Sequence, residues 1–317
     1  MRGYILRRLL QLVPTILLIT FMVFALLHAM PGDPARALVG PGEALDEAQL
    51  ASIRREYNLD KPILVQYGLW LGRALTGDLG RSAITQRRVG EELGLRALVT
   101  LELGIFAWLI ASVIAVPTGI VAALNRGRPI DLAVTMAAVA AVALPGFWFG
   151  IMLILLFGVR LGWLPTQGYV ALGDNPADAL RHMLMPAFAL GITSAALVMR
   201  QMRSAMVEVL SQDYVRTARA KGLGRRAVVL AHALRNALLP VVTVLGLQAA
   251  FLVGGLVPIE TVFNIPGIAR FLVEAVRWRD YPIVQNLVML IAFVVITVNF
   301  LVDMAYMALD PRIKFAD

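Results

Sequence analysis

The sequence predicts an all-α polytopic membrane protein with six transmembrane helices. Of its 317 residues, 59% are hydrophobic and 16% are charged, and the mean hydropathy is +0.75, whereas about a quarter of the residues in an average soluble domain are charged. The apolar residues come in runs of 17 to 28 with almost no charge inside, and a helix needs about 20 such residues to cross the hydrocarbon core. These observations exclude a soluble globular protein.

Six apolar segments are long enough to be transmembrane helices. They are Leu9–Met30, Val99–Leu124, Leu132–Val159, Met183–Met199, Leu238–Ile259 and Ile283–Leu309. The first has 22 residues, more than the h-region of about 7–15 residues in a signal peptide, and no clean small-x-small cleavage site follows it. We therefore expect a retained helix, and we expect Pro145-Gly146 to loosen the hydrogen-bond ladder of the third segment.

Basic residues in the short loops predict that both termini are cytoplasmic. With the N-terminus inside, 15 of the 29 Lys and Arg residues face the cytoplasm, and five lie in the two short external loops. The net charge of +8 is therefore explained by topology. The sequence has no basic patch interleaved with stacking aromatic residues, so it does not indicate nucleic acid as a partner. Because the chain has no cysteine, it has no disulfide framework, thiolate nucleophile or cysteine-based metal site.

The chain divides into three predicted parts. Residues 1–30 form the cytoplasmic N-terminus and first transmembrane helix, residues 31–98 an external cap, and residues 99–317 a five-helix core with a cytoplasmic loop at 200–239. In the cap, Leu45–Tyr57 and Pro62–Leu75 have helical patterns. The cap either receives a partner at the outer face or seals the helix bundle.

The cytoplasmic loop at 200–239 is far longer than a simple helix connection requires. Asp213 is a plausible N-cap for a short helix Tyr214–Lys221, and Gly222 is placed to take the left-handed conformation that ends it. We expect this helix to expose Ala218 and Ala220, so that a groove on another protein could approach its backbone closely. Composition alone is also compatible with a loop that serves only as a basic anchor and contacts only anionic lipid.

After the short helix, the sequence predicts a second basic helix from Arg225 toward Asn236. Pro240 is then expected to open the fifth transmembrane segment, since proline is tolerated in the first turn of a helix.

Two carboxylates interrupt the apolar segments. Glu102 begins the second segment, and Asp303 lies near the end of the sixth. Either group could reach the membrane interface, pair with a neighbouring helix or line a polar translocation path. They would also be the coupling groups of an ion-coupled secondary transporter, although the sequence has no obvious inverted repeat of broken helices.

An intramembrane enzyme that uses histidine side chains is a third possible class of protein. Its catalytic or metal-ligating candidates are His28, His182 and His232, but no two share a helix face at metal-binding spacing. The sequence contains no G-x-S-x-G nucleophile elbow. We therefore expect no catalytic residue and no metal site.

The cytoplasmic loop resembles a known family. Asp213-Tyr-Val-Arg-Thr-Ala-Arg-Ala-Lys-Gly222, followed by His232-Ala-Leu-Arg-Asn-Ala-Leu-Leu-Pro240, is similar to the coupling-loop signature of permease subunits in bacterial ATP-binding cassette (ABC) importers, specifically the dipeptide/oligopeptide/nickel branch. Arg216 stands where the general signature has Glu, and Arg235 where it has Pro. Further similar segments are Pro31–Pro34, Tyr57–Pro62, Gly77–Gly80, Leu144–Gly146 and Pro258–Gly267.

The resemblance implies an importer of the peptide class in the bacterial inner membrane. Its expected partners are a second permease, two cytoplasmic ATPase subunits, an external solute-binding protein and membrane lipid. No G-x-x-x-x-G-K-[ST] is present, so ATP and Mg²⁺ would be held by the ATPases, with no cofactor on this chain. The resemblance assigns ATPase coupling to nine residues, which are Asp213, Tyr214, Arg216, Thr217, Ala218, Ala220, Lys221, Gly222 and Leu234.

Overall fold

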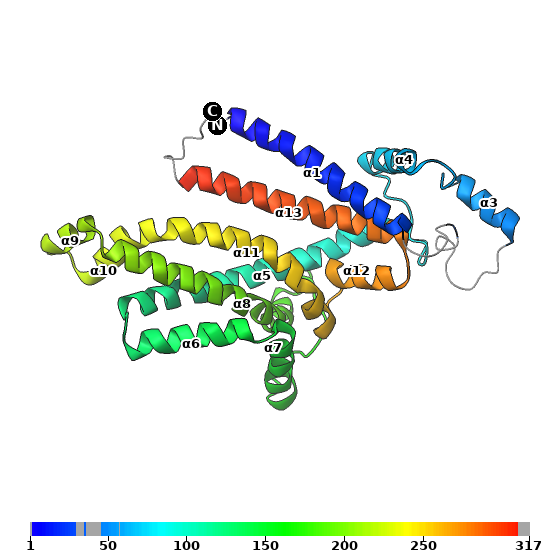
Figure 1. The fold of residues 1–317 in the computed structure, drawn as a ribbon. Coiled ribbons are helices and arrows are strands. Elements are labelled where there is room, and N and C mark those ends of the chain that lie inside the picture. Colours follow the sequence, from blue (N-terminus) through cyan, green and yellow to red (C-terminus); the bar gives the residue numbers. More distant parts are fainter. Residues whose placement is uncertain (1, 30–34, 36–45, 57, 310–317) are drawn as a thin grey trace. The chain divides into compact units, whose positions relative to one another are not determined.

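The computed structural model describes residues 2–29, 35, 46–56 and 58–309, and it describes their side chains except at 2–11, 56, 249–255, 302, 303 and 305–309. Within these residues the regular structure is helical, apart from one isolated bridge between Arg81 and Arg88 (Figure 1). The chain divides into two compact units, Met1–Thr100 with Gly267–Thr297 and Leu101–Pro266 with Val298–Asp317. The predicted all-α class is confirmed.

The helices have the following bounds. The first unit contains α1 (Arg2–Ala29), α3 (Glu47–Glu56), α4 (Ile63–Leu75) and α12 (Ile268–Arg277). The second contains α6 (Pro129–Ala143), α7 (Gly146–Leu153), the π-helix η1 (Ile154–Arg160), α8 (Pro176–Leu210), α9 (Asp213–Ala220), α10 (Arg225–Ala227), the π-helix η2 (Val228–Ala233) and α11 (Leu234–Val262). Both units include parts of α5 (Val89–Leu124) and α13 (Tyr281–Leu309).

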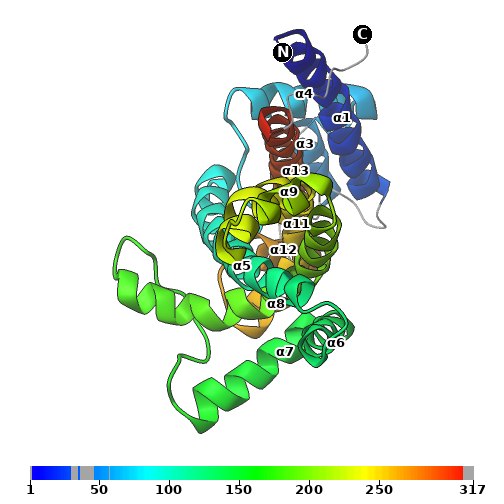
Figure 2. The same ribbon diagram turned by 90° about the vertical axis from the view of Figure 1, so that its left-hand side faces the viewer.

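Five helical stretches of the described chain are long and apolar enough to cross a membrane, and the bent pair α6 and α7–η1 makes a sixth if it is counted as one span. The third predicted segment, Leu132–Val159, is broken at Pro145, where the sequence predicts only a loosened hydrogen-bond ladder. Its two halves meet at 103°, and in Figure 2 α6 is seen nearly end-on while α7 lies across the view. Pro145 causes the break, because it cannot donate a backbone hydrogen bond and disfavours helical geometry at Leu144, whose ψ is 133°.

The core of the first unit forms where α1, the start of α5, α12 and the start of α13 meet. Its buried side chains include Leu27, Leu93, Phe271 and Leu287. Helix α12 was not predicted from the sequence. It is a short amphipathic helix whose apolar face is buried, and its ten residues are too few for the window that identifies membrane spans.

The core of the second unit depends on close approach of helix backbones at glycine. A Cβ added to Gly191 of α8 would lie 2.6 Å from the carbonyl oxygen of Ala107 in α5. At Gly119 of α5, a Cβ would lie 2.7 Å from the Cβ of Met202 and 2.9 Å from the carbonyl oxygen of Met199. Real Cβ atoms do not approach other atoms so closely, so both positions require glycine.

An ion pair between the buried Asp131 and the partly exposed Arg203 joins α6 to α8 in this unit. Asp131 is 5% exposed, and its two carboxylate oxygens accept hydrogen bonds of 2.6 and 2.7 Å from the guanidinium of Arg203. The backbone N–H of Gly127, whose φ is +76°, donates a third bond of 2.9 Å to the same carboxylate. Removal of Arg203 would leave the buried carboxylate of Asp131 without its charged partner and should destabilise the protein.

Gly119→Ala should destabilise the protein, whereas Gly104→Ala in the same helix should not. The added methyl at Gly119 would meet Met199 and Met202, while nothing lies within 4 Å of the corresponding position at Gly104. Overpacking costs about 1–3 kcal/mol, and alanine otherwise favours a helix over glycine by about 1 kcal/mol. Thermal unfolding midpoints of the detergent-solubilised transporter measure the difference. Equal midpoints for both variants would contradict the assigned contact.

Candidate functional site

Helix α9 ends in a Schellman motif. The N–H of Gly222 donates to the carbonyl of Arg219 at 3.0 Å, and the N–H of Leu223 donates to the carbonyl of Ala218 at 3.4 Å. Gly222 has a φ of +79°, the left-handed conformation that this motif requires and that glycine adopts without a Cβ clash. The prediction for Gly222 is therefore confirmed.

The predicted N-cap of α9 was wrong. Gln212 occupies the cap position without a side-chain capping bond, and Asp213 is the first helical residue. The carboxylate of Asp213 still lies in the first turn, where negative charge is favourable for the helix dipole. It pairs at 3.4 Å with Arg216, and both side chains are exposed.

One face of α9 packs against the chain that follows it. Val215 is fully buried and Ala218 is 7% exposed, and both contact the buried Val228 of η2. The expectation that Ala218 is exposed was therefore wrong. Ala218 lies three residues after Val215 and so shares its face, which places it in the packing between α9 and η2.

The opposite face of α9 and the turn after it are exposed. The exposed residues are Asp213, Tyr214, Arg216, Thr217, Arg219, Ala220, Lys221, Gly222 and Leu223. Tyr214 is also attached to α11, because its hydroxyl accepts a 2.8 Å hydrogen bond from the side-chain amide of Asn236. Figure 1 shows α9 and α10 together at one end of α8 and α11.

The segment after α9 runs directly into α11. α10, η2 and α11 follow one another without an intervening loop, so the separate basic helix predicted from Arg225 toward Asn236 merges with the fifth span. Leu234 is the first residue of α11 and packs against the core of the second unit. Pro240 lies inside α11, so the expectation that it begins the span was wrong.

The carboxylate of Glu102 is hydrogen-bonded to a tyrosine of the second unit. The hydroxyl of Tyr169, in the connection between η1 and α8, donates a 2.8 Å hydrogen bond to this carboxylate. Burial first, and this hydrogen bond second, raise the pKa of Tyr169 to about 12, so the tyrosine remains a protonated donor at neutral pH. Asp303 lies in α13, but its side chain is outside the described part of the structure.

A cavity of about 410 Å³ lies between α7, α8 and α11. Its wall is mainly apolar, with Thr193, Ser194 and Gln248 as polar members, and Ser194 donates a 3.2 Å hydrogen bond to the side-chain oxygen of Gln248. This site was not predicted from the sequence, because only the charged residues within the apolar segments were taken as candidates for the translocation path. Uncharged polar residues inside apolar segments were the signal that could have identified it.

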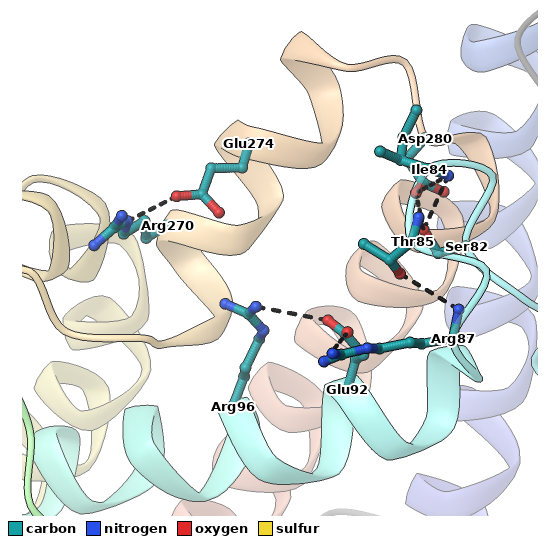
Figure 3. Close-up of polar contacts among 9 residues, drawn as sticks. All are labelled: Ser82, Ile84, Thr85, Arg87, Glu92, Arg96, Arg270, Glu274 and Asp280. Atoms are coloured by element: carbon teal, nitrogen blue, oxygen red, sulfur yellow. Dashed lines mark hydrogen bonds and ion pairs between the residues drawn. The ribbon is translucent and has the colours of Figure 1, made fainter. Parts of the chain in front are cut away.

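A polar network organises the junction between α12 and α13 in the first unit (Figure 3). Asp280 is 2% exposed and accepts hydrogen bonds from the Ser82 hydroxyl and from the N–H groups of Ala83 and Ile84. It also caps α13, because it accepts a 3.3 Å bond from the N–H of Ile283. The network fixes the loop before α5 onto the start of α13.

A second polar cluster in Figure 3 centres on Glu92 of α5. Its carboxylate lies 3.6 Å from the guanidinium of Arg87 and 3.6 Å from that of Arg96. Arg96 also lies 3.9 Å from the ring centre of Phe271 in α12, within the range of a cation–π interaction. Arg96 therefore joins α5 to α12.

Two of the three histidines make local contacts to a backbone carbonyl one helical turn earlier. Nδ1 of His28 lies 2.8 Å from the carbonyl oxygen of Phe24, and Nδ1 of His182 lies 2.9 Å from that of Asp178. His232 is exposed in η2. Among the described residues, no group of three or more His, Cys, Asp or Glu side chains could hold a metal ion.

Family models and solved structures similar to this chain come from binding-protein-dependent transporters and ABC transporters. Residues 115–315 match the family described as binding-protein-dependent transport system inner membrane component, and residues 1–87 match the N-terminal region of such membrane components. A structure of the MetNI methionine ABC transporter in inward-facing conformations superposes with a TM-score of 0.55 at 18% identity, covering 69% of this chain and 96% of that one. A crystal structure of an amino acid ABC transporter with histidines gives a TM-score of 0.50 at 16% identity, covering 69% and 94%.

Full-length relatives are more similar in sequence. The glutathione transport system permease protein GsiC of Salmonella choleraesuis (strain SC-B67) is 43% identical over 315 residues, which cover 99% of this chain and 100% of the relative. The protein of the same name from Escherichia coli (strain K12) is 41% identical over 315 residues with the same coverage. The chain therefore belongs to the binding-protein-dependent transport system inner membrane component family and is a permease subunit of an ABC importer of the peptide/nickel type.

Proposed function

We propose that this permease moves small peptides into the cytoplasm, driven by two ATPase subunits that dock on α9. A second permease completes the membrane path, an external solute-binding protein delivers the cargo, and ATP and Mg²⁺ are held by the ATPases. The names of the relatives, which are glutathione permeases, support a cargo of tripeptide size. The absence of a P-loop from the sequence supports an external source of work.

The main support for the coupling proposal is that α9 has one face buried against the chain and one face exposed to a partner. Val215 and Ala218 hold one face against η2, and the Tyr214 hydroxyl is bonded to α11. The other face offers Arg216, Ala220 and Lys221 to a partner. A force applied to this face would pass to α8 and α11, because Val209 and Leu210 of α8 also pack against the buried face of α9.

In this proposal some of the coupling residues contact the ATPase and the others maintain the structure of the coupling segment. Tyr214, Arg216, Thr217, Ala220 and Lys221 contact the ATPase, together with Asp213 at the start of the helix. Ala218, Gly222 and Leu234 hold the coupling segment in shape from within the chain.

The cavity between α7, α8 and α11 is proposed to be part of the translocation path. Its apolar wall with a few polar groups suits a small organic solute, and Ser194 and Gln248 would bond to peptide groups. Glu102 is proposed to have a structural task, since its carboxylate already accepts a hydrogen bond from Tyr169. The ATPases then supply the driving force that a secondary transporter would take from proton binding at Glu102 or Asp303.

Gly222→Ala should reduce ATP-dependent uptake, whereas Gly224→Ala should not. Neither position has an atom within 4 Å of an added Cβ, but Gly222 has a φ of +79° and Gly224 a φ of −62°. A left-handed conformation costs an L-residue about 1–2 kcal/mol, so only the first variant should loosen the end of α9. Peptide uptake and ATPase activity are measured in proteoliposomes with the whole transporter. Unchanged uptake with Gly222→Ala would contradict the coupling proposal.

Single cysteines test the proposed topology, in which both termini are cytoplasmic. The chain has no native cysteine, and Gly173 and Gly224 have open space around an added side chain without a left-handed φ. A membrane-impermeant thiol reagent applied to intact spheroplasts should label Gly173→Cys and not Gly224→Cys. Reversed labelling would place the N-terminus outside.

Glu102→Gln and Asp303→Asn should leave ATP-dependent accumulation in place. Glutamine keeps an oxygen that can accept the hydrogen bond of Tyr169, and an ATP-driven cycle needs no proton exchange at either site. Uptake is measured in proteoliposomes with ATP, with and without an ionophore that dissipates the proton gradient. Accumulation that requires the gradient and is lost in either variant would favour an ion-coupled transporter instead.

A further inference from the structure

Helix α4 is apolar on almost every side. Among its 13 residues, ILVQYGLWLGRAL, only Gln66 and Arg73 have strongly polar side chains, and none of the 13 is buried. Its exposed apolar residues are Ile63, Leu64, Val65, Leu69 and Leu75, with exposed fractions of 38%, 68%, 46%, 40% and 80%. If these side chains faced water, the protein would lose the favourable free energy that comes from removing apolar surface from water.

The other side of α4 packs against α1 in the same unit (Figure 1). The hydroxyl of Tyr67 lies 2.8 Å from that of Thr20 and donates a 3.1 Å bond to the carbonyl of Leu17. The rings of Tyr67 and Trp70 lie 5.6 and 6.2 Å from that of Phe24. These contacts fix the level at which α4 crosses α1.

That level lies inside the apolar part of α1. The apolar window of α1 is Leu12–Ala29, and a helix rises about 1.5 Å per residue. Phe24 is therefore about 7–8 Å along the axis from Ala29, and Thr20 is about 13–14 Å from it. Amphipathic helices at a membrane surface typically lie about 5–10 Å into the boundary between head groups and acyl chains.

We infer that α4 lies within the lipid leaflet at the Ala29 end of α1, with the face centred on Val65 and Leu69 in contact with acyl chains. In the topology proposed above, this is the outer leaflet. The choice of lipid as occupant follows from the level on α1. It also follows from α1 itself, whose Leu18 and Met22 are exposed and lie about 120–160° around the helix from Thr20 and Phe24, on the side away from α4.

The polar groups of α4 agree with this position. Tyr67 and Trp70 belong to the residue types that concentrate where lipid meets water. Arg73 is exposed near the C-terminal end of the helix, and a long arginine side chain places its charge at the head groups while its stem stays in apolar surroundings. The second helix of the segment predicted to be an external cap is thus part of the membrane-embedded surface.

The test uses fluorescent labels on single cysteines in the assembled transporter, reconstituted into vesicles and selected for normal uptake. Val65→Cys and Leu69→Cys report on α4. Met22→Cys, 62% exposed on α1, is the lipid control, and Ser52→Cys on the exposed face of α3 is the water control. Two quenchers are compared, phospholipids brominated on the acyl chain and aqueous iodide.

The expected result is that brominated lipid reduces emission from Val65 and Leu69 as much as from Met22, while iodide quenches Ser52 several-fold more than either. Strong iodide quenching at Val65 and Leu69 would overturn the inference in favour of an aqueous cap. Protection from both quenchers would also overturn it, because protein would then cover this face. The result does not depend on transport direction or on the cargo, so failure here is distinct from failure of the proposed function.

Discussion

Close contact between helix backbones at glycine is the constraint on which the packing of the second unit depends. In lipid, apolar side chains gain little by leaving their solvent for a neighbouring helix, so helices associate through van der Waals contact at small residues. Gly191 and Gly119 allow α5 and α8 to approach until one methyl group would not fit. The same holds for α7, where a Cβ on Gly150 would lie 2.9 Å from the ring of Phe263.

This packing bears directly on the proposed coupling between the ATPases and the membrane helices. α8 leads into α9 through only Ser211 and Gln212, so a helix in close backbone contact with α5 at Gly119 and Gly191 continues almost directly into the proposed docking surface. The Asp131–Arg203 pair lies two turns before the end of α8 and adds a charged connection to α6. Tightly packed helices with discrete polar contacts switch between arrangements as units, so a movement of α9 would be transmitted to α8 as a whole.

Buried carboxylates serve structure in both units. Asp131 and Asp280 each accept at least three hydrogen bonds from groups distant in the sequence or in the adjoining turn, which offsets the cost of removing their charge from water. Asp280 fixes a loop and caps a helix, whereas Asp131 joins two helices. Neither lies in the middle of an apolar segment, so a search for charges at the centre of the spans does not find them.

The sequence by itself determined the class, the number of apolar segments, helices α3 and α4, and the left-handed turn at Gly222, because each depends on composition or on residues close together in the chain. Similarity of the loop at 213–240 also identified the family. Only the tertiary structure decided that Ala218 is buried, that Pro145 separates two helices at 103°, that α10 and η2 continue into α11, and that Ser194 and Gln248 meet in one cavity. Those outcomes depend on which distant side chains come into contact, and helical periodicity carries no information about the partner that a given face will meet.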